Sequence, residues 1–149
     1  MLHRSASFLL VMLATFGCTA PSAPTYFSAE FVLTDVDGHS LPANSTSSSR
    51  ALPVTLIAGY MSMDESGTAY LHEDRTDGQS RYSLDTPYFF TVKGTDIRFD
   101  YAIPPCTYGS PCPDPPTGTI LDSGLHVQLV FPPTYAFQVY TFRVVPRVN

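Results

Sequence analysis

The stretch Tyr88–Tyr101, YFFTVKGTDIRFDY, predicts the fold more directly than any other part of this 149-residue chain. On both sides of Gly94 every second residue is aromatic or aliphatic, and these residues are Tyr88, Phe90, Val92, Ile97, Phe99 and Tyr101. Alternation with a period of two places such residues on one face of a strand, and the Gly94-Thr95-Asp96 turn would join two strands into an antiparallel hairpin. The stretch therefore predicts a β-hairpin with one inward apolar face.

Strand-like runs separated by turn residues fill most of the remaining chain after residue 28. They cover Glu30–Val36, Val54–Met63, Thr68–Asp74, Ser80–Leu84, Thr117–Asp122, Leu125–Phe131 and Tyr135–Val145. Pairs such as Asp37-Gly38 and Asp77-Gly78 are typical of the turns between strands. We therefore expect an all-β domain over residues 29–149, an antiparallel up-and-down meander of eight or nine strands that forms a closed or nearly closed barrel.

Composition and charge limit the classes of function that the chain can perform. Hydrophobic residues make up 44% and charged residues 14%, a balance that suits one globular domain rather than a disordered chain. The formal net charge is -5, and Lys93 is the only lysine. Because an acidic chain repels phosphate backbones, nucleic acid is not an expected partner.

The first 17 residues have the organisation of a secretory signal peptide. A short positively charged segment precedes the apolar run Phe8–Phe16, FLLVMLATF. This run is far shorter than the roughly 20 residues that a membrane-spanning helix needs. Pro21 and Pro24 follow the small residues at which an ordinary signal peptidase would cut, which favours cleavage before Cys18 instead.

The run Leu13-Ala14-Thr15-Phe16-Gly17-Cys18 resembles the lipobox of bacterial lipoprotein precursors. The resemblance implies a lipid on Cys18 and stable membrane anchoring through two or three acyl chains. Residues 18–28, rich in proline, serine and alanine, would then tether the domain to the membrane. We expect an exported, membrane-anchored lipoprotein, in the outer membrane of a cell with two membranes because no aspartate follows Cys18. Secretion or a periplasmic location without a lipid is the alternative.

The other two cysteines, Cys106 and Cys112, lie in the proline-rich segment Pro104–Pro116, PPCTYGSPCPDPP. In an exported protein, two cysteines this close in a turn-rich loop are expected to form a disulfide. A zinc site would need further cysteine or histidine ligands, and none lies near in the sequence. The sequence therefore favours a disulfide over a metal site.

Several short motifs occur in the same order as in the small bacterial lipocalin-like lipoproteins. They are Val36-Asp37-Gly38 followed by Leu41-Pro42, Gly67-Thr68 after an acidic turn, Phe90-Thr91-Val92-Lys93-Gly94, Ile97-Arg98-Phe99, Thr117-Gly118-Thr119 and Leu125–Leu129. The chain resembles this family over most of residues 29–145. The resemblance implies a lipocalin-like barrel and gives the fold more than the function.

Inward residues of such a barrel either line a cavity or fill the core. The candidates for cavity lining are Tyr88, Phe90, Val92, Ile97, Phe99, Tyr101 and Val127. A small eight-strand barrel has room for little more than its own side chains. Both a filled core and a cavity for a small apolar ligand remain open at this stage, since both require inward apolar residues.

No catalytic residue and no cofactor is predicted from the sequence. His39, His72 and His126 are far apart in the chain, and no serine lies in a Gly-x-Ser-x-Gly motif. Asp35-Val36-Asp37-Gly38 lacks the later ligands of a calcium loop and is better explained as a turn. Glu73-Asp74, like the acidic pair before Ser66, is interpreted as solvated charge of a hairpin.

Three functions from different classes follow. The first is a lipid-anchored barrel with a structural or interaction role, whose envelope protein partner binds exposed aromatics such as Tyr108 and Tyr135. The second is a lipocalin-like carrier of a small apolar ligand. The third is an envelope hydrolase, which would need the histidines and acids gathered in one pocket.

Overall fold

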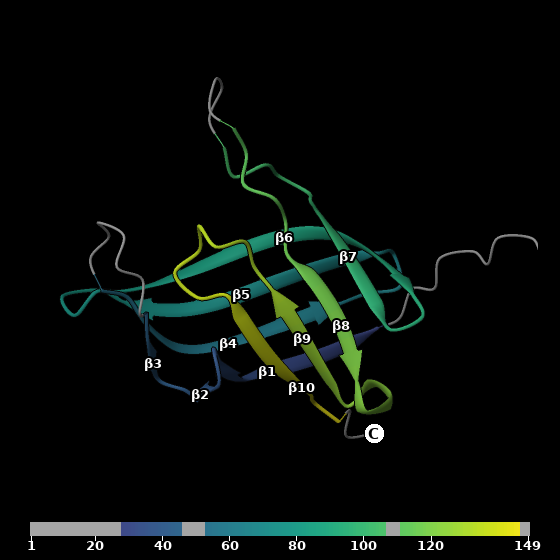
Figure 1. Ribbon diagram of the computed structural model, residues 1–149, viewed down its shortest axis with the longest axis horizontal. Coiled ribbons are helices and arrows are strands. Elements are labelled where there is room, and N and C mark those ends of the chain that lie inside the picture. Colours follow the sequence, from purple (N-terminus) through teal and green to yellow (C-terminus); the bar gives the residue numbers. More distant parts are fainter. Residues whose placement is uncertain (1–27, 46–52, 107–110, 147–149) are drawn as a thin grey trace, which may run out of the picture.

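The computed structural model describes residues 28–45, 53–106 and 111–146 and contains one antiparallel sheet (Figure 1). Its elements are β1 (Ala29–Val36), β2 (His39–Ser40), β3 (Ala43–Asn44), β4 (Thr55–Met63), β5 (Thr68–Thr76), β6 (Arg81–Lys93), β7 (Asp96–Tyr101), β8 (Thr117–Leu121), the 3-10 turn η1 (Asp122–Gly124), β9 (His126–Val130) and β10 (Val139–Val144). Within the described ranges no helix is long or apolar enough to cross a membrane.

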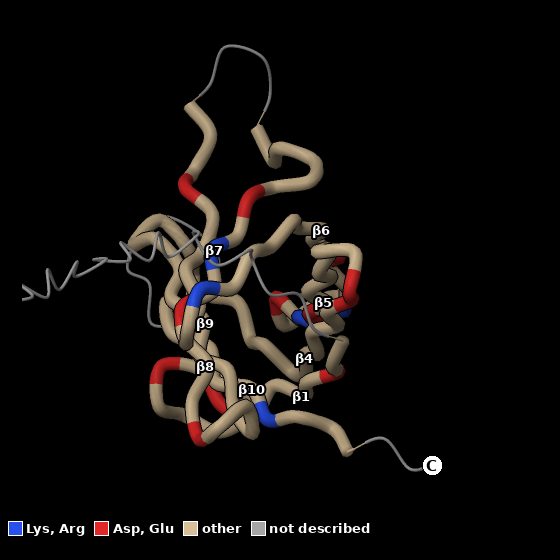
Figure 2. The backbone as a smooth tube through the Cα atoms, turned by 90° about the vertical axis from the view of Figure 1, so that its right-hand side faces the viewer, with Lys and Arg blue, Asp and Glu red and all other residues tan. Residues whose placement is uncertain are grey.

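The sheet closes into a barrel because β1 pairs with both β10 and β4. Of the ten strands, the two-residue β2 and β3 lie outside the ring, which leaves eight strands in the order β1-β10-β9-β8-β7-β6-β5-β4. Figure 2 looks into this ring, with β4, β5 and β6 on one side and β7 to β10 on the other. The prediction of an all-β, up-and-down barrel is thus confirmed, and the arrangement is consistent with a lipocalin-like fold.

Inward side chains from every strand of the ring form the core. Buried residues alternate with more exposed ones along most of the ring, most regularly in β7, β9 and the second half of β6, as a period of two requires. The largest fully buried side chains include Phe31, Met61, Leu71, Phe99 and Phe142, which come from five different strands. Gly118 lies among them, where an added Cβ would come within 3.0 Å of Ile97 Cβ. The barrel is therefore tightly packed at this level.

Strand β6 joins two runs that the sequence analysis treated as separate strands, and Pro87 lies between them. The Pro87 carbonyl accepts a hydrogen bond from the Ala102 N–H, on the side of β7. A residue's N–H and C=O point to the same side of a strand, so the N–H that proline lacks would also face β7. Strand β7 ends at Tyr101, so none of its residues pairs with Pro87. The pairing of β6 with β5, on the other side, continues through Pro87 without a break.

Two other boundaries differ from the expectation. The strand-like run Leu125–Phe131 was expected to place Leu125 on its inward face, but Leu125 is exposed, because it caps η1 in a helical conformation (φ -75°, ψ -26°) and β9 begins only at the next residue. The last strand was predicted from Tyr135 but begins at Val139, since Phe131–Gln138 forms a connection in which Tyr135 N–H bonds the Pro132 carbonyl. The Asp37-Gly38 turn is present as expected, with a positive φ at both residues.

The barrel wall is longer on one side than on the other. Strand β7 pairs with residues 88–93 of β6, whereas β5 pairs with residues 81–89. The first half of β6 therefore extends with β4 and β5 beyond the closed ring, as the long strands at the left of Figure 1 show.

The connection after β7 carries the disulfide that the sequence predicts. Cys106 and Cys112 form a disulfide with their Cα atoms 5.1 Å apart. The predicted signal peptide (residues 1–17), Cys18 and all of the tether except Ser28 lie outside the described residues.

Candidate functional site on the wall of strands β4 to β6

Four consecutive residues of β5, His72-Glu73-Asp74-Arg75, send charged or titratable side chains alternately to the two faces of the barrel wall. Glu73 and Arg75 share the inward face with Leu71, while His72 and Asp74 point outward. We call Glu73, Arg75 and Tyr140 the inner cluster. We call His72, Asp74, Ser83 and Asp85 the outer cluster.

The inner cluster is a buried ion pair completed by a phenol. Arg75 Nη2 donates to Glu73 Oε1 at 2.7 Å, and Tyr140 Oη donates to the same oxygen at 2.6 Å. The side chains of Glu73 and Arg75 are 6% and 14% exposed. The interpretation of Glu73 as a solvated hairpin charge is therefore wrong, because its strand position aligns it with Leu71 rather than with Asp74.

The environment of the inner cluster fixes the protonation of two of its members. Burial disfavours the Arg75 charge, but the attraction and hydrogen bond of Glu73 outweigh burial and raise the pKa of Arg75. Burial, and then the Glu73 carboxylate, raise the pKa of Tyr140. Arg75 therefore stays charged, and Tyr140 stays a hydrogen-bond donor. Both support the carboxylate that they contact.

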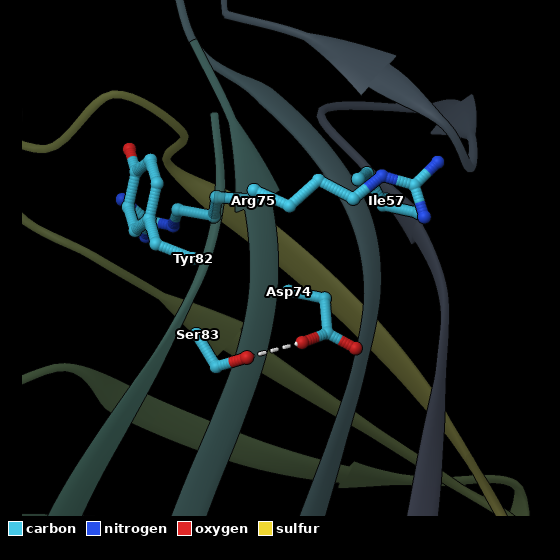
Figure 3. A pocket seen from close by; sticks show the side chains of 6 residues that line it. Ile57, Asp74, Arg75, Tyr82 and Ser83 are labelled. Atoms are coloured by element: carbon cyan, nitrogen blue, oxygen red, sulfur yellow. Dashed lines mark hydrogen bonds between the residues drawn. The ribbon is translucent and has the colours of Figure 1, made fainter. Parts of the chain in front are cut away.

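Arg75 also borders a pocket at the extended end of the wall. The pocket has a volume of about 210 Å³ and is lined by Ile57, Asp74, Arg75, Arg81, Tyr82 and Ser83. Figure 3 shows that Asp74 and Ser83, from β5 and β6, are joined by a hydrogen bond there. Among the described residues, Arg75 Nε is the one buried side-chain polar atom without a hydrogen-bond partner. The lining is mixed, with four polar or charged residues.

The outer cluster is a chain of hydrogen bonds across β5 and β6. His72 Nδ1 lies 2.6 Å from Asp85 Oδ1, and His72 Nε2 lies 3.3 Å from Asp74 Oδ1. Ser83 Oγ donates to the same Asp74 oxygen at 2.6 Å. The Tyr60 ring stacks on the imidazole with ring centroids 4.6 Å apart. Three neighbouring strands thus hold His72 in one orientation.

This arrangement limits the chemistry of His72. The hydrogen bond to Asp85 is the main cause that raises the pKa of His72, and the charges of Asp85 and Asp74 add to it. With a carboxylate at each ring nitrogen, the protonated imidazole is favoured, and no nitrogen is left to accept a proton. Ser83 contacts Asp74 rather than His72. The cluster therefore lacks the contact between nucleophile and base that acyl transfer needs.

Among the described residues, the other two histidines, His39 and His126, are not brought to His72. His126 Nδ1 lies 2.9 Å from Asp122 Oδ2 at the start of β9, and His39 is exposed in β2. In the ring, β9 is separated from β5 by three strands in either direction, so His126 and His72 lie on opposite sides of the barrel. Within the described residues no three His, Cys, Asp or Glu side chains are placed to hold a metal ion.

Three exposed aromatic side chains run diagonally over the outer face beside His72. Tyr60, Tyr70 and Phe89 come from β4, β5 and β6 and are each at least 50% exposed. Tyr60 is opposite His72 in the sheet, and Tyr70 is opposite Pro87, so each ring is a diagonal neighbour of the next. We call these three residues the aromatic strip. The exposed carboxylates that border it are Asp74, Asp85 and Asp100.

The seven side chains considered for cavity lining all point inward. Six are buried, and Tyr101 is half-buried. They pack on one another, with ring centroids 5.6 Å apart for Tyr88 and Phe99 and 5.3 Å apart for Tyr88 and Tyr101. Tyr135, expected to be exposed, is half-buried and shares a hydrogen bond with Tyr101, while Tyr108 lies outside the described residues.

Sequence reasoning missed both clusters, although a signal for each was present. The Asp77-Gly78 turn was recognised, and counting outward from it along a regular hairpin places His72 opposite Asp85 and Asp74 opposite Ser83. The parity of Glu73 with Leu71 likewise places its carboxylate inside. Tyr140 could not be found in this way, because its strand reaches Glu73 only through the closed barrel.

Comparisons with protein-family models, with curated proteins and with solved structures found no match. The structure shows a small eight-strand antiparallel barrel with a disulfide between Cys106 and Cys112. Function is therefore inferred from the residues and from the geometry given above.

Proposed function

We propose that this chain is an exported, lipid-anchored β-barrel of the cell envelope that binds a partner protein through the aromatic strip. The single observation that carries the interaction is the exposure of Tyr60, Tyr70 and Phe89 on neighbouring strands. Aromatic side chains, tyrosine above all, are enriched among the residues that dominate protein–protein binding energy. The lipid anchor rests on Cys18 and its resemblance to a lipobox.

The surroundings of the strip define the chemistry of the partner. The carboxylates of Asp85 and Asp100 border it, and the chain carries a net charge of -5. A partner surface with apolar groups inside a basic rim would complement both features. The strip also lies on regular, hydrogen-bonded strands, so binding would cost little ordering of the backbone.

Site-specific photocrosslinking in living cells tests the interaction. A photoreactive phenylalanine analogue at Tyr70 is expected to yield one discrete crosslinked product with a partner protein. The matched control places the analogue at Leu125, which is equally exposed but on the other side of the barrel. Equal crosslinking at both positions, or none at Tyr70, would contradict a specific surface. Loss of acyl labelling in Cys18→Ser tests the anchor separately.

A carrier of a small ligand is the second candidate, and the pocket beside Arg75 favours it. Tyr82 and Leu84 point toward the barrel interior but remain exposed at the extended end of β6. The pocket volume of about 210 Å³ is below the several hundred Å³ typical of ligand sites, and its lining is largely polar. These two features rank the carrier below the interaction module.

Native mass spectrometry with a fatty acid as the probe separates the two candidates. A carrier is expected to retain a stoichiometric fatty acid, and Tyr82→Ser would reduce the bound fraction. An interaction module is expected to retain none, with Tyr70→Ser and Tyr82→Ser indistinguishable. Bound fatty acid that responds to Tyr82→Ser would reverse the ranking.

A further inference from the structure

The first half of β6 has a free edge. Residues 81–86 pair with β5, and no described strand pairs with them on the other side. Because the Pro87 carbonyl faces β7, alternation requires the N–H and C=O groups of Arg81, Ser83 and Asp85 to point to that same free side. All residues from Arg81 to Asp85 are exposed.

The residues at this edge are complementary to themselves when read in opposite directions. In an antiparallel pair centred on Ser83, Arg81 of one copy would lie opposite Asp85 of the other, so opposite charges would face each other twice. Tyr82 would lie opposite Leu84 on the inward-facing side, where both side chains are 37% and 39% exposed in the single chain. Cross-strand pairs of opposite charge and pairs of aromatic with aliphatic residues both stabilise antiparallel sheets.

We propose that two copies of this chain associate through the edge of β6, antiparallel and centred on Ser83. Each of the three opposed pairs would exchange two backbone hydrogen bonds, about six in all. The contact would continue the wall β4-β5-β6 into the second barrel and cover Tyr82 and Leu84. This inference does not depend on the proposed partner protein, because it rests on the edge of β6, which shares only Asp85 with the border of the aromatic strip.

A second copy fits this edge better than an unrelated strand does. Exposed edges are usually protected by charged side chains such as lysine, by bulges or by proline, which discourage pairing. Here the two edge charges have opposite signs and equal distances from Ser83, and proline occurs only at residue 87, where the edge ends. The described parts of the connection after β7 rise away from β6 rather than along this edge (Figures 1 and 2), and Ile103 within them is exposed.

Sedimentation equilibrium of the complete exported protein in density-matched detergent tests the association. Wild type is expected to be a dimer, and Ser83→Pro is expected to weaken it about tenfold or more, since proline removes an N–H that faces the free edge. Ser83→Ala is the matched control, because it removes the same hydroxyl and keeps the N–H. It should dimerise like wild type.

Charge reversal provides a test that does not require proline to be tolerated. Arg81→Glu would oppose two acids at both ends of the contact and should weaken the dimer, whereas Arg81→Glu/Asp85→Arg should restore it. A short bismaleimide should link two copies of Ser83→Cys and not of Thr91→Cys, which lies beyond the edge. A monomeric wild type, or a dimer insensitive to Ser83→Pro and to Arg81→Glu, would overturn the proposal.

Discussion

The inner and outer clusters both join acidic to basic side chains on the same stretch of β5, and burial is what separates them. Glu73 and Arg75 are largely removed from water, and the Glu73 carboxylate accepts its hydrogen bonds from Arg75 and Tyr140. His72 and Asp74 lie one residue away but meet solvent, where Asp85 is 71% exposed. In water an ion pair gains little because solvent screens it, whereas a buried charge without its partner is costly.

The comparison teaches that position on the strand, not charge, decides what a residue does here. A shift by one residue moves a carboxylate from the interior to the surface of the barrel. The inner cluster is therefore expected to govern stability. The outer cluster is expected to affect stability weakly and to shape the surface beside the aromatic strip.

The largest expected effect is that of Glu73→Ala. It would leave the Arg75 guanidinium buried without its carboxylate, and removal of one partner of a buried pair costs about 3 kcal/mol or more. Urea unfolding followed by circular dichroism would measure this loss, because the chain has no tryptophan whose fluorescence could report unfolding. The midpoint should fall with little change in the slope.

A matched control distinguishes whether Glu73→Ala loses stability through the unpaired charge or through lost packing. Replacing the whole inner cluster, as Glu73→Leu/Arg75→Met/Tyr140→Phe, leaves no unpaired polar group. Buried pairs replaced by apolar residues of similar volume are commonly neutral or stabilising, so the triple variant should regain most of the lost stability. If it were less stable than Glu73→Ala, the buried pair would itself be a net source of stability.

Tyr140→Phe is expected to have a smaller effect of about 2 kcal/mol. It removes one donor to the Glu73 carboxylate, and hydrogen bonds to charged groups contribute about that much. Arg75 Nη2 still serves the same oxygen, so the charge is not left alone. A loss as large as that of Glu73→Ala would mean that Tyr140, rather than Arg75, is the essential partner.

The smallest expected effect concerns the outer cluster and depends on pH. Folding raises the pKa of His72 above its ordinary value of 6.5, so this interaction stabilises the fold below pH 6.5 and is lost as the pH rises through the folded pKa. Asp85→Asn should lower the free energy of unfolding by less than about 1 kcal/mol at pH 5.5. At pH 8.5 the loss should be smaller than at pH 5.5. Urea midpoints at the two pH values measure it, and an effect larger at pH 8.5 would contradict this coupling.

Most of the fold was predictable because alternation is a local property. Tyr88–Tyr101 predicted a hairpin, and β6 and β7 form it around Gly94. The predicted division of β6 at Pro87 is wrong, and the reason lies in a contact between strands. Proline is tolerated there because β7 has already ended and needs no N–H from residue 87. The residues around Pro87 do not determine where a neighbouring strand ends.

The candidate site was less predictable for the same physical reason. The pairing of His72 with Asp85 follows from one hairpin and was within reach of the sequence. The contact of Tyr140 with Glu73 joins residues 67 positions apart and requires the ring to close. Exposure of the aromatic strip likewise depends on which face the closed barrel presents to solvent, because Tyr60 alternates with buried Met61 like any other strand residue.

The shared oxygen of Glu73 has a consequence for how the barrel avoids misassembly. If β5 slid by two residues against its neighbours, its apolar face would still point inward, and hydrophobic burial alone would barely distinguish the error. Such a slip would carry the carboxylate away from the phenol that β10 holds in place, leaving the buried acid with Arg75 but without its second donor, Tyr140. The mispaired barrel would then carry an electrostatic penalty that the native one avoids. The hydrogen bond between Tyr140 and Glu73 thus favours the native alignment of the strands over the shifted one.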